Sequence, residues 1–111
     1  MVARGDIIVV SLAGDYGKPR PALVIQSDTT LAVTGSVTFC LLTSELVEGS
    51  HLRIDVPSNS DTGLERRSQV QSDKIFTLPM AKIRGPIGRV GGEFMGSVDL
   101  ALALHLGLLA R

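Results

Sequence analysis

The sequence is poor in the residues on which many enzymes rely, with no tryptophan, one cysteine and two histidines among 111 residues. The single cysteine, Cys40, excludes an internal disulfide and argues against a zinc cluster. Because Cys40 lies in the apolar run 37–42, we expect a buried core thiol. His51 and His105 are far apart and have no nearby nucleophile, which argues against a catalytic triad. The acidic residues show no metal-ligand spacing, so we predict no metal site.

The chain also lacks an excess of charge, because 11 Lys and Arg balance 11 Asp and Glu. Any nucleic-acid site must therefore be a local patch. Aromatic residues make up 4% of the chain, which is few for a base-stacking surface like those of RRM or OB domains. No apolar run is long enough to span a membrane, and the first residues do not look like a signal peptide. We therefore expect a cytoplasmic protein that does not bind membranes.

Short segments rich in β-branched and apolar residues make up most of the chain. They predict strands at 6–12, 21–26, 37–43, 51–56, 69–72, 74–78 and 87–90, separated by turn-forming residues. One helix is predicted near the end, with Ser97 as N-cap, Asp99 in the first turn and Gly107 at the close. Residues 98–106 are apolar almost all round, which predicts burial on every side, against the sheet and a second subunit. We predict one mostly β domain, 1–111, with a C-terminal α-helix.

The segment Gly17-Lys18-Pro19-Arg20-Pro21 places a cation between two prolines where a loop enters a strand. Proline fixes its own φ and restricts the residue before it, so Arg20 is presented from a stiff backbone. Such a guanidinium can bind a phosphate with two parallel hydrogen bonds and neutralise charge that grows there during a reaction. The residues alone leave open an equally simple alternative, in which Arg20 pairs with a carboxylate of a neighbouring strand.

An ordered set of short motifs extends over nearly the whole chain. It comprises Arg4-Gly5-Asp6-Ile7, Arg20-Pro21-Ala22-Leu23-Val24-Ile25-Gln26-Ser27-Asp28, Leu42-Thr43-Ser44, Gly63-Leu64, Ser68 to Asp73, Gly88-Arg89-Val90 and Leu106-Gly107-Leu108. This set resembles the MazF/PemK toxins of type II toxin–antitoxin systems. The resemblance implies a compact SH3-like, CcdB/PemK-like β-barrel, a symmetric homodimer, and an endoribonuclease that works without metal or other cofactor.

The resemblance also implies a mechanism on single-stranded RNA, in which the ribose 2′-OH attacks the adjacent phosphate and leaves a cyclic phosphate and a 5′-OH. In similar toxins the arginine of the Arg-Pro element and a threonine at the end of the third strand form the catalytic pair, which here are Arg20 and Thr43. Some relatives add an arginine and an aspartate from a later strand. The matching residues here are Gln71 and Asp73, so Asp73 is a further predicted catalytic residue and the general base stays unassigned.

Residues expected to contact RNA are polar or cationic and adjoin these motifs; they are Lys18, Ser44, Arg66, Arg67 and Gln71. The run Glu65-Arg66-Arg67 is either a local phosphate-binding patch or an ordinary solvated loop. By the same resemblance, we expect a small, acidic, partly disordered antitoxin as partner, because cations that bind phosphates also bind carboxylates. Such toxins cleave messenger RNA and inhibit growth, and we expect sequence-specific cleavage here.

Two other functions remain open at this point. CcdB-type toxins share the expected fold but poison DNA gyrase, through a tail containing a tryptophan, a residue that this chain lacks. A noncatalytic SH3-like module that binds a partner protein would explain the neutral charge and the scarcity of aromatic residues. Substituting Arg20 separates these functions, because only the nuclease would lose an enzymatic activity.

Overall fold

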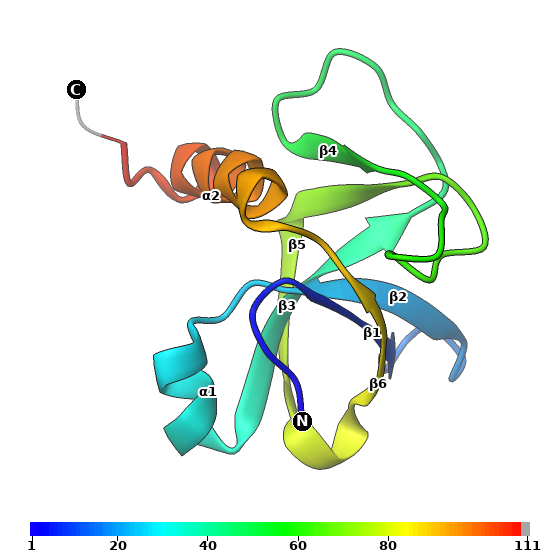
Figure 1. The fold of residues 1–111 in the computed structure, drawn as a ribbon, viewed down its shortest axis with the longest axis vertical. Helices are drawn as coiled ribbons and strands as arrows, with labels where there is room; N and C mark the ends of the chain where they lie inside the picture. The colour runs from blue at the N-terminus through cyan, green and yellow to red at the C-terminus, as the bar shows by residue number, and fades with distance from the viewer. Residues whose placement is uncertain (110–111) are drawn as a thin grey trace.

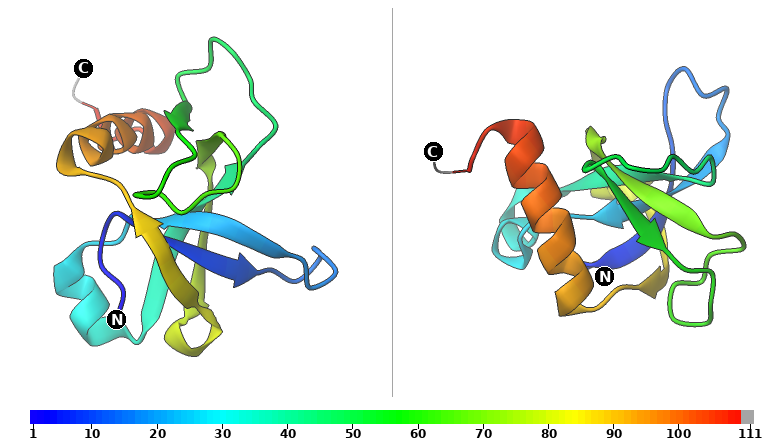
Figure 2. Two further views of the ribbon diagram at one scale, coloured as in Figure 1. Left: turned by 45° about the vertical axis from the view of Figure 1, so that its right-hand side comes forward. Right: turned by 90° about the horizontal axis from the view of Figure 1, so that it is seen from above.

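The computed structural model describes residues 1–109, which form one antiparallel sheet and two α-helices. The strands are β1 (Asp6–Ser11), β2 (Pro19–Val24), β3 (Ser36–Thr43), β4 (Arg53–Val56), β5 (Ser68–Pro79) and β6 (Arg84–Arg89), in the spatial order β4-β5-β3-β2-β1-β6. The helices are α1 (Asp28–Thr34) and α2 (Gly92–Leu106), and η1 (Met80–Lys82) is a 3₁₀ turn. Figures 1 and 2 show a strongly curled sheet with α2 beside β4 and β5. The predicted mostly β fold with a C-terminal helix is confirmed. Among residues 1–109, no helix is long and apolar enough to cross a membrane.

The central strands are buried on both faces, because their alternate side chains enter two different cores. The core beneath α2 contains Ile7, Leu23, Cys40, Leu42, Val56, Leu64, Val70, Val90, Met95 and Val98. The core capped by α1 contains Ile8, Val10, Ala22, Val24, Leu31, Val37, Phe39 and Leu41. Double burial explains why these strands read as continuous apolar runs. Cys40 is fully buried, as predicted, and burial, with a smaller effect of the Asp73 charge, raises the pKa of its thiol to about 12.

β5 is one long strand, where the sequence predicted two short ones. Its register with β3 shifts between the pairs Leu42↔Val70 and Cys40↔Ile75, so residues 71–74 lie opposite Leu41 alone. A bulge of this kind bends the strand and re-aims its side chains. The bend lets the first part of β5 pair with β4 and the rest with β3 alone.

Helix α2 begins at Gly92, so the predicted N-cap at Ser97 is wrong. Met95 is buried in the core, and this packing extends the helix upstream through glycines that local propensity disfavours. Asp99 consequently lies in the middle of α2 instead of its first turn. It forms an ion pair with the guanidinium of Arg4, which also donates a hydrogen bond to the carbonyl of Ile25.

The outer face of α2 is apolar and exposed in the single chain. Met95, Val98 and Ala101 are the buried side chains of the helix, whereas Leu100 is 63% exposed and Leu104 is 49% exposed. The predicted packing of one face against the sheet is confirmed, and burial of the rest by a second subunit stays a prediction. A stripe of leucines remains for a second surface to cover.

Helix α1 was not predicted, because its sequence DTTLAVT is rich in β-branched residues that lower helix propensity. Hydrogen bonds and backbone geometry at the two helix ends compensate for this low helix propensity. The Oγ of Ser27 accepts a hydrogen bond from the Thr29 N–H at 3.2 Å, and Gly35 ends the helix in the left-handed conformation with φ of 67°. Leu31 then anchors the helix in the second core.

The loop between β4 and β5, residues 57–67, rests directly on β6. A Cβ added to Gly63 would overlap the carbonyl of Ile87, and one added to Gly88 would overlap the backbone of Thr62. Only glycine permits this approach, and Gly63 also has a positive φ of 68°. The glycines therefore hold the loop against β6.

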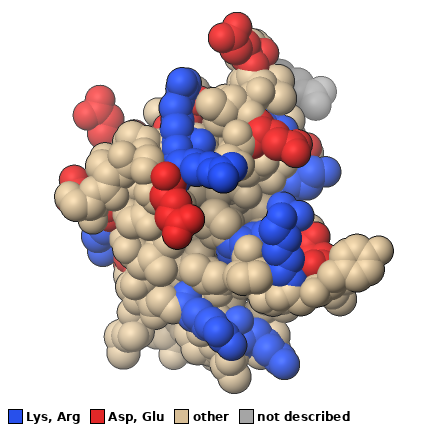
Figure 3. All heavy atoms as spheres, turned by 90° about the vertical axis from the view of Figure 1, so that its right-hand side faces the viewer, with Lys and Arg blue, Asp and Glu red and all other residues tan. Residues whose placement is uncertain are grey.

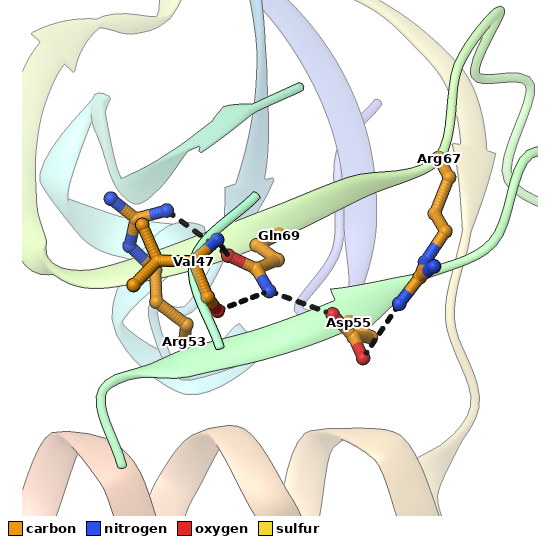
Figure 4. A network of polar contacts seen from close by, with 5 residues as sticks. All are labelled: Val47, Arg53, Asp55, Arg67 and Gln69. Atoms are coloured by element: carbon orange, nitrogen blue, oxygen red, sulfur yellow. Dashed lines mark hydrogen bonds and ion pairs between the residues drawn. The ribbon is translucent and has the colours of Figure 1, made fainter. Parts of the chain in front are cut away.

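A buried glutamine joins the loop between β3 and β4, residues 44–52, to the sheet (Figure 4). Gln69 is 5% exposed, and its Oε1 accepts hydrogen bonds from the Val47 N–H and from Arg53 Nη1, both at 3.0 Å. Its Nε2 donates to the Val47 carbonyl at 3.0 Å and to Asp55 Oδ1 at 2.9 Å. Both ends of the amide are thus satisfied, which holds the loop in one position.

This network predicts which substitutions raise the pKa of Asp55. The hydrogen bond from Gln69 lowers the pKa of the Asp55 carboxyl below its ordinary value, and the hydrogen bond and charge of Arg67, at 3.2 Å, add to the effect. Gln69→Met and Arg67→Gln should therefore each raise this pKa, as measured by carbon-13 NMR titration of the carboxyl. Because the folded pKa is depressed, the stabilisation is present above the unfolded pKa and is lost as the pH falls through the folded pKa. An unchanged pKa of Asp55 in Gln69→Met would contradict the assignment.

Candidate active site

A groove of about 920 Å³ opens between the ends of β2 and β3 and the loop 57–67. Six of the eight residues predicted to act on RNA line it, namely Lys18, Arg20, Thr43, Ser44, Arg66 and Gln71. They come from three separate stretches of the chain, namely the entry into β2, the end of β3, and the β4–β5 loop with the first part of β5. Figure 3 shows that Lys and Arg side chains gather on this face, with Asp and Glu among them. The fold therefore assembles a local, mixed-charge site in a chain without net charge.

Arg20 lies at the start of β2 and pairs with Val10 of β1 in the sheet. Its side chain is 37% exposed, and its Nε is 2.6 Å from Oδ2 of Asp15 in the β1–β2 loop. The Nε–H is not directed at that oxygen, so the contact is an ion pair without a hydrogen bond. The acidic partner is thus in the adjoining loop and not on a neighbouring strand. An ion pair through Nε leaves the Nη1–Nη2 edge of the planar guanidinium geometrically available to a second anion.

Thr43 lies opposite Arg20 at the same end of the neighbouring strand. Ala22 of β2 pairs with Leu41 of β3, and two residues further along each antiparallel strand are Arg20 and Thr43. The Oγ1 of Thr43 accepts a hydrogen bond from the Glu45 N–H at 3.1 Å, so its O–H can still donate. The predicted catalytic pair therefore faces one groove, with a cation and a hydroxyl donor side by side.

Two predicted residues lie away from the groove lining. Arg67 forms an ion pair with Asp55, at 3.2 Å from Nη2 to Oδ2. Of the two arginines in the run Glu65-Arg66-Arg67, only Arg66 lines the groove. Asp73 is exposed on the β5 bulge, and its charge acts on the buried Cys40. The structure does not bring Asp73 together with Arg20 and Thr43.

The sequence analysis missed the carboxylates of the site. Glu45 and Glu65 line the groove, and Asp15 contacts Arg20. For Asp15 a signal existed, because the hairpin turn between β1 and β2 returns the loop toward the start of β2. The two glutamates had none, since long-range packing alone places them. Residues 1–109 contain no group of three or more His, Cys, Asp or Glu side chains placed to hold a metal ion.

The sequence has clear relatives among curated proteins. Residues 3–106 match the model of the family described as PemK-like, MazF-like toxin of type II toxin-antitoxin system. The probable endoribonuclease MazF of Mycolicibacterium smegmatis is 38% identical over 106 residues, covering 95% of this chain and 96% of that protein. Endoribonuclease MazF9 of Mycobacterium tuberculosis is 29% identical, covering 97% of this chain and 98% of that protein.

Solved structures share the fold over nearly the full length. An endoribonuclease in complex with its cognate antitoxin, from a mycobacterial species, superposes with a TM-score of 0.83 at 23% identity and covers 100% of both chains. The Mycobacterium tuberculosis toxin MazF-mt6 superposes with a TM-score of 0.79 at 22% identity, over 95% of this chain and 99% of that one. These structures confirm the predicted toxin-like barrel, and the sequence matches confirm the predicted family. The chain belongs to the PemK-like, MazF-like toxins of type II toxin–antitoxin systems, and the curated members that it matches are named endoribonucleases.

Proposed function

We propose that this chain, as a single domain 1–111, is an endoribonuclease toxin that cleaves single-stranded RNA, messenger RNA in particular. The observation that carries the proposal is that Arg20, at the start of β2, and Thr43, at the end of the neighbouring antiparallel strand β3, line one groove. Membership of the toxin family and the names of the curated relatives support the same activity. A cytoplasmic location follows from this substrate and is part of the proposal.

The proposed reaction is an internal transfer at one phosphate. The ribose 2′-oxygen bonds to phosphorus, the bond from phosphorus to the 5′-oxygen breaks, and the products carry a cyclic phosphate and a 5′-hydroxyl. Arg20 holds the non-bridging oxygens through its Nη1–Nη2 edge and neutralises the charge that grows in the transition state. The Thr43 hydroxyl donates to the same phosphate and orients it. As the family resemblance implies, no metal takes part in this scheme.

Proton transfer completes the reaction, since the 2′-OH loses a proton and the 5′-oxygen gains one. Asp73 stays a predicted catalytic residue, although it lies outside the groove lining. Glu45 and Glu65 do line the groove, so each is a further candidate for accepting the 2′ proton. Lys18 and Arg66 supply the other positive charges of the groove. Gln71 and Ser44 supply neutral hydrogen-bonding groups, and Arg67 stays a predicted RNA contact.

The relatives do not favour the two alternative functions. The matched family is described as toxins of toxin–antitoxin systems, and the curated members are named endoribonucleases. A gyrase poison or a noncatalytic binding module would require no catalytic arginine, so the Arg20 variants below separate them from the nuclease.

The purified protein should cleave single-stranded RNA in EDTA, and duplex RNA or DNA far less, because attack needs a 2′-OH free to align with the phosphate. Arg20→Ala should lose about two or more orders of magnitude in cleavage rate, the effect of removing one transition-state charge stabiliser. Arg20→Lys should restore little, because an ammonium does not replace a planar fork. Initial rates on a defined oligonucleotide measure both. Arg84→Ala, an exposed arginine of β6 that does not line the groove, is the matched control. Undiminished cleavage by Arg20→Ala would refute the assignment.

We further propose a two-fold symmetric homodimer, because the exposed leucines of α2 leave an apolar stripe that a second subunit would cover. The protein should therefore be a dimer at micromolar concentration in analytical ultracentrifugation. Leu100→Glu combined with Leu104→Glu places charges on the stripe and should shift the equilibrium toward monomers if the stripe is in the interface. A well-folded wild-type monomer at these concentrations would contradict the proposal.

A small acidic antitoxin, partly disordered when alone, is the proposed partner. A solved structure that shares the fold is titled as an endoribonuclease in complex with its cognate antitoxin. Expression of the wild-type toxin alone should arrest bacterial growth, and co-expression of an acidic protein encoded next to it should relieve the arrest. Arg20→Ala should be harmless. The complex should compete with RNA and weaken with salt, because carboxylates would occupy the phosphate-binding cations. Growth and bulk mRNA unaffected by the wild type would refute the toxin function.

A further inference from the structure

A second hollow adjoins the groove at Arg20. It has a volume of about 360 Å³ and lies between the β1–β2 loop and the bulged part of β5. Its lining includes Leu12, Arg20, Leu41, Gln71, Lys74 and Phe76. Arg20 and Gln71 belong to both the groove and the hollow. A phosphate held at Arg20 therefore adjoins both the groove and the hollow, as the scissile phosphate of an RNA strand adjoins two nucleotides.

The hollow contains an aromatic ring that the core does not cover. Phe76 is 38% exposed, although the chain has only three phenylalanines and one tyrosine. Its ring rests on that of Phe39, which is fully buried, with the centroids 6.3 Å apart and the planes at 25°. The two residues are also directly paired between β3 and β5. The buried ring thus supports Phe76 from within, and its exposed part is a firm surface on which a base can stack.

Polar groups on the same strand complete the hollow. Lys74 is exposed, and it lines the hollow together with Phe76, two residues further along β5. Gln71 offers both an amide donor and an acceptor, which match the edge of an unstacked base. An aromatic surface, a cation and an amide beside a phosphate-binding arginine form the set of groups that binds one nucleotide of a single strand.

We propose that this hollow is a nucleotide subsite, in which the base adjacent to the scissile phosphate stacks on Phe76 while Lys74 contacts the next phosphate. The inference rests on the proposed endoribonuclease function and adds a residue-level basis for substrate selection. It assigns roles to Lys74 and Phe76, for which the sequence provided no functional signal. Stacking tolerates any base, so Gln71 supplies the preference for one base edge over another.

The test uses an RNA oligonucleotide made uncleavable by a 2′-deoxy substitution at the site that the wild type cuts. A single abasic residue is placed on one side of the scissile phosphate in one oligonucleotide and on the other side in a second. One of the two positions should weaken binding to the wild type by about tenfold, the scale of one base–aromatic stack. Phe76→Leu should weaken binding of the intact oligonucleotide to the same extent and should show no further loss with the abasic one. Phe76→Tyr keeps the ring and should bind as the wild type does.

Salt dependence tests the role of Lys74 independently. Lys74→Gln should reduce the slope of log K against log salt by about 0.7, the contribution of one single-strand phosphate contact. The matched control is Lys82→Gln. Lys82 is an exposed lysine of η1 that lines neither the groove nor the hollow, so its substitution should leave the slope unchanged. The Lys74 variants and the abasic scan on the wild type remain informative if Phe76→Leu does not fold.

The outcomes separate the subsite from the function on which it rests. Absence of any RNA cleavage by the wild type would overturn the proposed function. Normal cleavage together with equal abasic losses in the wild type and Phe76→Leu, or an unchanged slope in Lys74→Gln, would overturn the subsite alone. Loss of antitoxin binding in Phe76→Leu with intact RNA binding would assign the hollow to the antitoxin and overturn the subsite as well.

Discussion

The bend in β5 is the constraint on which the rest of the site depends. Four residues of this strand, 71–74, lie opposite Leu41 alone, so the strand must turn there to keep its pairing on both sides. Its first part then reaches β4, and its second part follows β3 to the end. The curled sheet that results brings the ends of β2 and β3 under the β4–β5 loop. Gln71 lies in this bend and lines both the groove and the second hollow.

The charge of the site is local and is balanced by nearby carboxylates. Three cations line the groove together with Glu45 and Glu65, and Asp15 contacts Arg20 from the adjoining loop. An anionic phosphate must therefore compete with protein carboxylates for the same cations. In this arrangement geometry matters more than net charge, because the ion pair of Arg20 occupies one edge of its guanidinium and leaves the other edge to the substrate. The neutral overall composition is thus compatible with a site for a polyanion.

Two loops make the walls of the groove, and each is held by contacts that local sequence does not reveal. Loop 57–67 lies against β6 because Gly63 and Gly88 have no Cβ to separate the two backbones. Loop 44–52 is held by the buried amide of Gln69, which is hydrogen-bonded at both ends. In both cases a residue distant in sequence positions the side chains of the site. Such residues tolerate substitution poorly although they contact no substrate.

The sequence by itself determined the mostly β architecture, the buried Cys40 and the importance of the Arg20 segment. Alternating and apolar runs report burial directly, and proline restricts the backbone wherever it stands, so these features need no tertiary information. Tertiary structure decided where α2 begins, because the packing of Met95 outweighs the poor propensity of the glycines before it.

Within the site, too, the sequence determined some features and the tertiary structure decided others. The order of motifs predicted Arg20 and Thr43 as site residues, and the antiparallel arrangement of β2 and β3 brings both to one groove. Only the folded chain separates Arg66, which lines the groove, from Arg67, which pairs with Asp55. Only the fold shows that Phe76 is exposed next to Arg20, since its apolar strand reads as an ordinary buried one. The physical reason is that periodicity reports whether a side chain faces a core, whereas the position of a charge or a ring in a site depends on contacts between residues far apart in sequence.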